Sequence, residues 1–267
     1  MFTCGIDIGS LSSKAAIMDD GKIVSWILDR TGPDSIETSN KVMEATLSKA
    51  NLKMSDIAYI VSTGYGRVVV PFANKSITEI SCHAKGANYF FPRTRTILDM
   101  GGQDCKAIRC DETGKVKAFI MNDKCAAGAG RYMEVVADLI NEPLEEIGSK
   151  SLKIIEKVQP ITSNCAVFAK SEIMTLLRSG VYKNDIMAGV CDALAIRVVE
   201  LLQKVEVEKE LSITGGIGKN IGVVQRVEEK IGMKAEICFE PQIVGAIGAA
   251  IFARERAEKE LAKGKKA

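Results

Sequence analysis

The sequence predicts an α/β protein made of two duplicated halves, each built on a sheet that starts with a β-hairpin. Glycine-rich loops follow β-prone runs at three places along the chain. The order strand, glycine loop, strand, hairpin turn, strand occurs twice, and helical periodicity dominates the remainder. With 267 residues, the chain is long enough for one large or two modest domains that fold without disulfides.

Composition narrows the class of protein. Lys plus Arg number 36 against 34 for Asp plus Glu, so the net charge of +2 gives no basic field for nucleic acid or an anionic membrane. The first residues have neither a basic nor an apolar region typical of a signal peptide, and Asp7 interrupts them. No apolar stretch approaches the roughly 18 residues that span a bilayer. We therefore expect a cytoplasmic protein with no membrane or nucleic-acid partner.

The first half shows one clear order of elements. We expect a hairpin after the first glycine loop, then a helix, a buried strand and a second helix. The expected strands are 3–8, 15–18, 23–28 and 57–62, and the expected helices are 35–50 and 78–90.

The second half begins with the same order and then becomes mostly helical. The expected strands are 96–100, 105–110, 116–121, 211–214 and 235–239, and the expected helices are 125–140, 164–178, 184–205, 219–231 and 242–260. A proline at the start of the last helix suits a first helical turn.

A shift of 92 residues relates the two hairpins and indicates an internal duplication. It superposes Asp7 on Asp99, Gly9 on Gly101, Lys14 on Lys106, Ala15 on Ala107 and Asp19 on Asp111. Pro92 disfavours helix continuation, so we expect a first lobe at 1–92 and a second at 93–267. The closing helix 242–260 is compatible with packing back on the first lobe.

The three glycine loops, which start at Asp7, Asp99 and Thr214, suit a metal-bound triphosphate. Glycine lets backbone N–H groups approach phosphate, and the hydroxyls of the first loop add donors. An Asp at a strand end can hold Mg²⁺ through water, and Lys14 can offset charge on the transferring phosphate. We expect neither Asp to be a core residue. Each loop alone is equally compatible with a structural turn, and neither a P-loop nor a Rossmann fingerprint is present.

In this order, the motifs resemble the superfamily of acetate and sugar kinases, heat-shock chaperones and actin. The resemblance implies a duplicated two-lobed actin-like ATPase fold (ribonuclease H-like), with two phosphate loops and one adenosine loop. The nucleotide-binding residues that it implies are Ser10, Ser12, Ser13, Lys14, Gly101, Gly102, Gln103, Asp104, Gly215, Gly216 and Gln242. Asp7 and Asp99 should steer Mg²⁺, and Gln103 or Asp104 should position the attacking water.

Two of the eight cysteines, Cys125 and Cys165, stand just before small-residue helix starts. Helix N-termini stabilise thiolates, which suits ligands of an anionic cluster. Two thiolates are too few for a [4Fe–4S] cluster, but a two-fold dimer would supply two more. Spacing alone slightly favours the alternative that both residues are buried core cysteines. We expect the other six cysteines to be core residues, and His83 to be a packed or capping residue.

Four segments sharpen the resemblance: TGYGR at 63–67, NDKCAAGAGR at 122–131, SNCAVFAKSE at 163–172 and PQIVGA at 241–246. They look like the activator (component A) of 2-hydroxyacyl-CoA dehydratases, a group that includes benzoyl-CoA reductase ATPase subunits. The resemblance implies a homodimer with one [4Fe–4S] cluster, held by Cys125 and Cys165 of each subunit. It also implies that ATP hydrolysis drives an electron from ferredoxin or flavodoxin into an iron–sulfur dehydratase or reductase.

Three alternatives remain open at this point. One is a small-molecule kinase of the same superfamily, pantothenate- or sugar-kinase-like, in which the cysteine pair is incidental. Another is an activator of a different iron–sulfur reductase, and the third is a nucleotide-sensing regulator without catalysis. Brown colour in anaerobically purified protein separates an activator from both the kinase and the regulator.

Overall fold

The computed structural model describes residues 1–122, 130–162 and 166–264. It divides the chain into two compact units. Unit 1 comprises Met1–Thr94, Cys110–Lys117 and Cys238–Ala267, and unit 2 comprises Arg95–Arg109 and Ala118–Ile237. The chain first passes from unit 1 to unit 2 after Thr94, close to the expected boundary at 92. Two later segments of the expected second lobe, Cys110–Lys117 and Cys238–Ala267, belong to unit 1.

The sheet of unit 1 has five strands in the order β3-β2-β1-β4-β5. Its central strand β1 pairs antiparallel with β2 and parallel with β4. The strands are β1 (Phe2–Ile8), β2 (Ser12–Asp19), β3 (Lys22–Arg30), β4 (Tyr59–Thr63) and β5 (Lys75–Ser76). The turn between β2 and β3 needs a positive φ at Gly21, which explains the Asp-Gly pair there.

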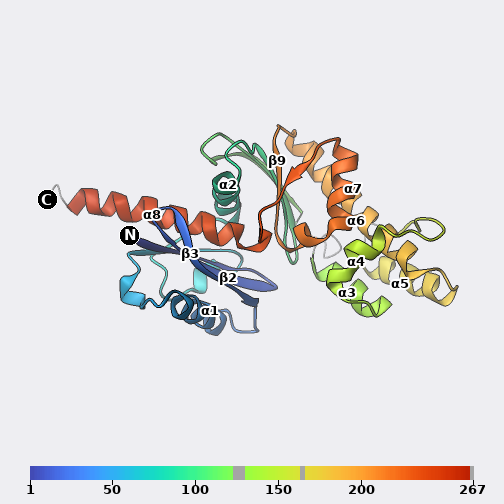
Figure 1. The fold of residues 1–267 in the computed structure, drawn as a ribbon, viewed down its shortest axis with the longest axis horizontal. Coiled ribbons are helices and arrows are strands. Elements are labelled where there is room, and N and C mark those ends of the chain that lie inside the picture. The colour runs from blue at the N-terminus through green and yellow to red at the C-terminus, as the bar shows by residue number, and fades with distance from the viewer. Residues whose placement is uncertain (123–129, 163–165, 265–267) are drawn as a thin grey trace. The chain divides into compact units, whose positions relative to one another are not determined.

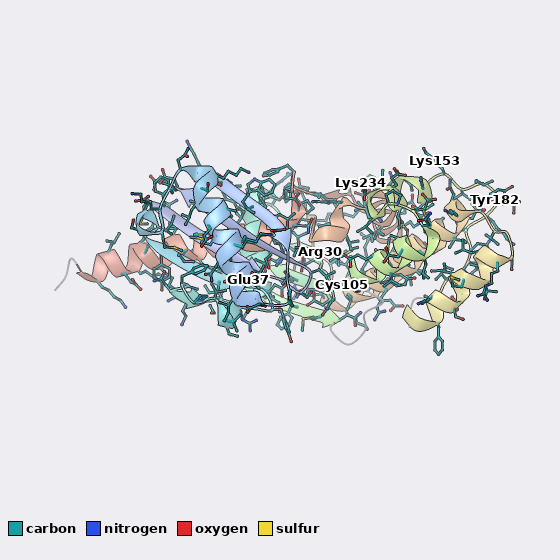
Figure 2. All side chains as sticks on the ribbon, turned by 90° about the horizontal axis from the view of Figure 1, so that it is seen from below. Arg30, Glu37, Cys105, Lys153, Tyr182 and Lys234 are labelled. Carbon is teal, nitrogen blue, oxygen red and sulfur yellow. The ribbon has the colours of Figure 1, made fainter. Side chains whose placement is uncertain are left out.

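The described part of unit 1 also has three α-helices: α1 (Ser35–Ala50), α2 (Glu79–Phe90) and α8 (Val244–Gly264) (Figure 1). Asp34 caps α1, whose first turn holds Glu37; Figure 2 labels Glu37 and also Arg30 at the end of β3. Apolar side chains of α1 pack with those of β1 and β2, and α8 packs with α2 and β4.

Helix α8 belongs to unit 1 because small residues let its backbone approach β1 and α2. A Cβ at Gly5 of β1 would overlap the carbonyl oxygen of Ala246, and a Cβ at Gly86 of α2 would overlap that of Val244. Only glycine permits such contacts. The closing helix is therefore part of the same unit as the first hairpin.

The sheet of unit 2 repeats this topology, in the order β8-β7-β6-β9-β10. Its central strand β6 pairs antiparallel with β7 and parallel with β9, as β1 does with β2 and β4. The strands are β6 (Thr96–Met100), β7 (Cys105–Cys110), β8 (Val116–Asn122), β9 (Leu211–Thr214) and β10 (Ala235–Glu236). The predicted duplication is thus confirmed in strand order and direction.

Unit 2 contains five described α-helices: α3 (Gly130–Ile140), α4 (Leu144–Ser151), α5 (Ala166–Arg178), α6 (Lys183–Val205) and α7 (Ile221–Ile231). Their apolar faces share one core with β6, β7 and β9. Sequence periodicity missed α4, because eight residues with a glycine inside give too short a pattern. The last strand ends at Glu236, earlier than expected, and α8 extends beyond residue 260.

A buried carboxylate organises the segment between α4 and α5. Asp185, in the first turn of α6, accepts hydrogen bonds from the backbone N–H groups of Ile155, Glu156 and Lys157. Asn184 donates to the carbonyl of Lys153 at 2.8 Å, and Figure 2 labels Lys153 together with Tyr182, the N-cap of α6.

Among the described helices, none is long and apolar enough to cross a membrane.

Candidate functional site

The first glycine loop is a tight turn between β1 and β2. The N–H of Gly9 donates to the carbonyl of Ser12 at 3.1 Å, and the Thr31 hydroxyl donates to the carbonyl of Gly9 at 2.8 Å. Ser13 is buried and its hydroxyl pairs with Thr31 at 2.7 Å. Ser13 therefore supports the loop from inside, whereas Ser10 and Ser12 lie at its partly exposed surface.

Asp7 and Lys14 form the ion pair beneath this loop. They are register partners on β1 and β2, and Lys14 Nζ lies 2.9 Å from Asp7 Oδ2. Lys14 also donates to the carbonyl of Ser12 at 3.4 Å. Asp7 is only 1% exposed, so the expectation that it lies outside the core is wrong. The end of β1 thus buries a carboxylate next to a glycine loop.

Gln242, which the resemblance alone singled out, lies at this loop. It belongs to a 3₁₀ turn, Pro241–Ile243, that precedes α8, and its N–H donates to Glu240 Oε1. The Gln242 amide donates to Ser12 Oγ at 3.3 Å. Residues 230 positions apart are therefore neighbours in unit 1.

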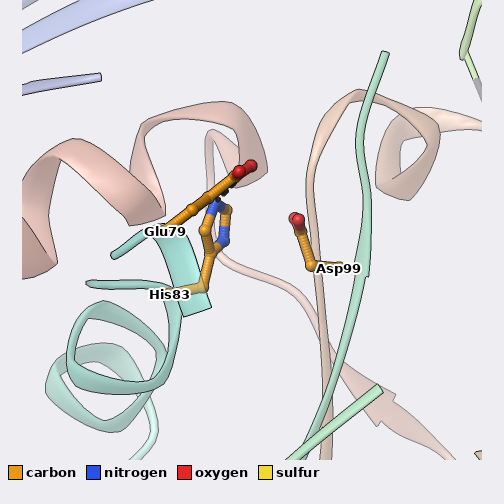
Figure 3. A group of neighbouring side chains, drawn as sticks. All are labelled: Glu79, His83 and Asp99. Atoms are coloured by element: carbon orange, nitrogen blue, oxygen red, sulfur yellow. Dashed lines mark ion pairs between the residues drawn. The ribbon is translucent and has the colours of Figure 1, made fainter. Parts of the chain in front are cut away.

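Helix α2 carries two further polar groups, of which His83 lies near Asp7 and Glu79 lies near His83. Glu79 and His83 lie one turn apart, with Oε1 and Nε2 4.0 Å apart, and His83 is 4% exposed (Figure 3). A Cβ at Gly245 would lie 2.9 Å from His83 Nε2 and 3.0 Å from Asp7 Oδ2. The absence of that Cβ leaves room for both side chains, so His83 is buried as expected and lies beside the Asp7 carboxylate.

The second glycine loop, in unit 2, has the same hydrogen bond as the first. The N–H of Gly101 donates to the carbonyl of Asp104 at 3.0 Å. Lys106 is 1% exposed and contacts two carboxylates, Asp104 Oδ1 at 2.8 Å and Asp99 Oδ2 at 3.4 Å. Asp99 is also 1% exposed and is therefore a core residue, contrary to expectation. Gln103 is exposed at the tip of the loop.

The third glycine loop follows β9 in the same unit. Gly215 has a φ of 83°, and a Cβ there would lie 2.9 Å from Asp99 Oδ1 and closer still to the carbonyl of Met100. A 3₁₀ turn, Gly216–Lys219, leads from it toward α7. Because only glycine tolerates both the φ and the contact, Gly215 keeps the second and third loops adjacent.

The start of α3 is fixed to the second glycine loop. The N–H of Gly130 donates to the carbonyl of Gly101 at 2.9 Å, and the N–H of Arg131 donates to that of Gly102 at 2.8 Å. These two donors belong to the first turn of α3, where a helix has no internal partners for them. Cys125 and Cys165 themselves lie outside the described residues.

The remaining six cysteines behave as core residues. Five are buried and Cys238 is partly buried. Burial raises the pKa of the Cys4 and Cys82 thiols to about 12, and it also raises the pKa of Cys105, Cys191 and Cys238. Since the thiolate is the metal ligand, the described cysteines are poor candidates for one.

Asp7 fits a role toward hydrated Mg²⁺. Within the described residues, its Oδ1 atom is buried and has no hydrogen-bond partner. A buried carboxylate oxygen without a donor is costly, and the waters of a hard cation are suitable donors for it. The donor set therefore agrees with the metal role that was expected for Asp7.

Sequence reasoning missed four residues of these sites: Thr63, Glu79, Lys106 and Thr214. Lys106 was visible in the shift of 92 residues as the equivalent of Lys14, yet it received no role. Glu79 lies one turn before His83 on a predicted helix, which was a usable signal. Thr63 and Thr214 each begin a glycine-rich segment that the sequence singled out. No local pattern assigned a role to either hydroxyl, because the neighbours of both residues depend on strand pairing.

Comparison with known proteins agrees with the motifs. A model described as the BadF/BadG/BcrA/BcrD ATPase family matches residues 4–253. The activator of lactoyl-CoA dehydratase from Anaerotignum propionicum is 44% identical over 97% of this chain and 100% of its own length. That similarity runs along the whole chain.

Two solved structures are similar throughout. The activator of 2-hydroxyisocaproyl-CoA dehydratase from Clostridium difficile, with bound ADPNP, has a TM-score of 0.93 at 38% identity and covers 98% of both chains. Component A of (R)-2-hydroxyglutaryl-CoA dehydratase from Acidaminococcus fermentans has a TM-score of 0.92 at 36% identity, covering 97% of this chain and 99% of its own. The expected actin-like, duplicated α/β fold is confirmed, and this chain belongs to the BadF/BadG/BcrA/BcrD ATPase family.

Proposed function

We propose that this protein is an ATP-dependent activator that delivers one electron at low potential to a partner iron–sulfur enzyme. The partner class is a 2-hydroxyacyl-CoA dehydratase, because relatives similar over the whole chain carry that activator role in their names. Ferredoxin or flavodoxin would supply the electron. A cytoplasmic location is part of the same proposal.

The nucleotide roles follow from the loops. Backbone N–H groups of the first and second glycine loops would bind phosphates, helped by Gln242 and the serines of the first loop. Gly215 and Gly216 of the third loop would contact the adenosine. Asp7 and Asp99 would steer hydrated Mg²⁺, and Lys14 would offset charge that develops during hydrolysis. Of the two residues expected to orient water, Asp104 is held by Lys106, whereas Gln103 is exposed.

The electron-carrying group in this proposal is one [4Fe–4S] cluster bound by Cys125 and Cys165 of each subunit in a homodimer. Four thiolates complete the usual ligand set of such a cluster, and a two-fold axis doubles each ligand. The cluster would supply reversible one-electron storage. The protein's own contribution would be to hold the cluster close to a nucleotide-binding loop.

One observation carries the proposal: the two backbone hydrogen bonds from Gly130 and Arg131 to Gly101 and Gly102. Gly130 follows Cys125 by five residues, so a rearrangement of the second glycine loop moves the end of the cysteine-bearing segment. A nucleotide shifts an equilibrium only between states that it binds differently. ATP and ADP, which differ in the phosphate that this loop would bind, satisfy that condition.

The test is the metal content of protein purified without oxygen. Wild-type protein should be brown, dimeric by light scattering, and should contain about four irons per dimer. Cys125→Ser and Cys165→Ser should each lose the iron, whereas the matched control Cys238→Ser should keep it. Four irons per monomer would contradict the shared cluster, and colourless protein that phosphorylates a small molecule would favour the kinase.

A further inference from the structure

The duplication extends from the hairpins to an atomic arrangement at the end of each central strand. In unit 2, Asp99 lies between Lys106 on β7 and Thr214 on β9, its register partners on the two sides. Thr214 Oγ1 donates to Asp99 Oδ1 at 2.8 Å, and Lys106 contacts Oδ2. Both carboxylate oxygens of Asp99 therefore have partners.

Unit 1 contains the same arrangement of residue types. Asp7 lies between Lys14 on β2 and Thr63 on β4, again as register partners. Gly64 follows Thr63 with a φ of 85°, as Gly215 follows Thr214 with a φ of 83°. A Cβ at Gly64 would overlap Asp7 Oδ1, so this glycine brings the loop after β4 against the carboxylate.

The two arrangements differ in one hydrogen bond. Asp7 is 1% exposed and Thr63 is fully buried, yet among the described residues neither Asp7 Oδ1 nor Thr63 Oγ1 has a hydrogen-bond partner. The Cys82 thiol lies near the Thr63 hydroxyl and its pKa is raised to about 12 by burial, an effect that the hydroxyl partly opposes. A protonated thiol is a weak partner, so it does not satisfy Thr63.

Two buried oxygen atoms without partners, on adjacent strands, indicate a bound molecule that supplies the missing hydrogen bonds. A water molecule can accept from the Thr63 hydroxyl and donate to the Asp7 carboxylate. We propose that Thr63 is a positioning residue, which together with Asp7 Oδ1 holds one water of the hydrated metal ion. The proposal rests on the proposed nucleotide function of this loop.

The hydrogen bond between Thr214 and Asp99 in unit 2 explains why Thr214 and Thr63 have different roles. Thr214 uses its hydroxyl directly on Asp99, which fixes that carboxylate and joins β6 to β9. Thr63 leaves Asp7 Oδ1 available. The same residue types thus form a structural contact in one unit and a binding position in the other.

The experiment compares Thr63→Val with Thr214→Val, because valine matches the shape of threonine and removes the hydroxyl. The first measurement is Mn²⁺ affinity in the presence of ADP, from the electron paramagnetic resonance signal of free Mn²⁺. The second is the thermal midpoint in EDTA without nucleotide. Thr63→Ser is the rescue variant, since it keeps the hydroxyl.

We expect Thr63→Val to weaken Mn²⁺ binding about tenfold, the loss of one hydrogen bond, with an unchanged or higher midpoint in EDTA. Thr63→Ser should bind Mn²⁺ as wild type does. Thr214→Val should instead lower the midpoint by about 4 °C, since it breaks a formed hydrogen bond.

A Thr63→Val protein with wild-type Mn²⁺ affinity would overturn the proposal and leave the nucleotide function standing. A Thr63→Val midpoint that falls as far as that of Thr214→Val would also overturn it, because the hydroxyl would then be structural. Absence of Mn²⁺·ADP binding by the wild type would instead contradict the proposed function itself.

Discussion

The backbone N–H of Arg131 donates to the carbonyl of Gly102 at 2.8 Å and so joins α3 to the second glycine loop. The side chain of Arg131 makes a different contact: its guanidinium pairs with Glu134, one turn along the helix, at 2.7 Å. Backbone and side chain can therefore be tested separately. The coupling between nucleotide and cluster should depend on the backbone N–H of Arg131, together with that of Gly130, and not on the Arg131 side chain.

Replacing Arg131 with proline should weaken that coupling. Proline removes the N–H and is tolerated in the first turn of a helix. In wild-type protein, an iron chelator should strip the cluster at different rates in the ATP-bound and nucleotide-free states. In Arg131→Pro the two rates should converge, whereas Arg131→Ala, which keeps the N–H, should retain the difference. Equal rates in the wild type would remove the support for nucleotide gating.

Lys14→Ala should lower ATP hydrolysis more than ATP binding. The Lys14 ammonium lies 2.9 Å from Asp7 Oδ2, beneath the first glycine loop. There its charge would offset negative charge on the phosphate that is transferred to water. An interaction that is stronger in the transition state affects kcat more than affinity. Turnover and equilibrium nucleotide binding, measured on the same preparation, check this. Equal losses in both quantities would assign Lys14 to ground-state binding.

Lys106→Met should destabilise the fold, because it leaves Asp99 and Asp104 without the cation that they share. Breaking a buried ion pair by removing one partner costs about 3 kcal/mol. The free energy of unfolding in urea measures the effect. Lys117, which is exposed in the other unit, offers the matched control variant Lys117→Met. A Lys106→Met protein as stable as the wild type would show that the two carboxylates need no shared cation.

Asp185→Asn should reduce stability at neutral pH and much less in acid. Burial raises the pKa of Asp185, but hydrogen bonds from three backbone N–H groups outweigh it, so the net pKa is lowered. A lowered folded-state pKa means that the stabilisation is complete above the unfolded value of about 4 and is lost as the pH falls through the folded value. Unfolding midpoints of wild type and variant should therefore converge as the pH falls below the unfolded pKa of about 4. A constant difference between them across this range would contradict the assignment.

Much of the fold could be predicted from local patterns. The hairpins, the glycine loops and the long helices all have short-range signals, and the repeat of Asp7, Gly9 and Lys14 at Asp99, Gly101 and Lys106 predicted the duplication. The structure confirms that duplication in strand order. The short helix α4 gave no adequate periodic signal, and the place of α8 in unit 1 depends on backbone contacts at Gly5 and Gly86.

The sequence by itself determined the glycine loops and the local strand pairs beside them. Asp7 pairs with Lys14, for example, because the two lie only seven positions apart with one turn between them. Only the tertiary structure decided the third member of each arrangement. Thr63 follows the first hairpin after one α-helix, whereas Thr214 follows the second after four described α-helices. No constant shift aligns both the hairpins and the threonines, and parallel strand pairing alone makes each threonine the neighbour of its aspartate.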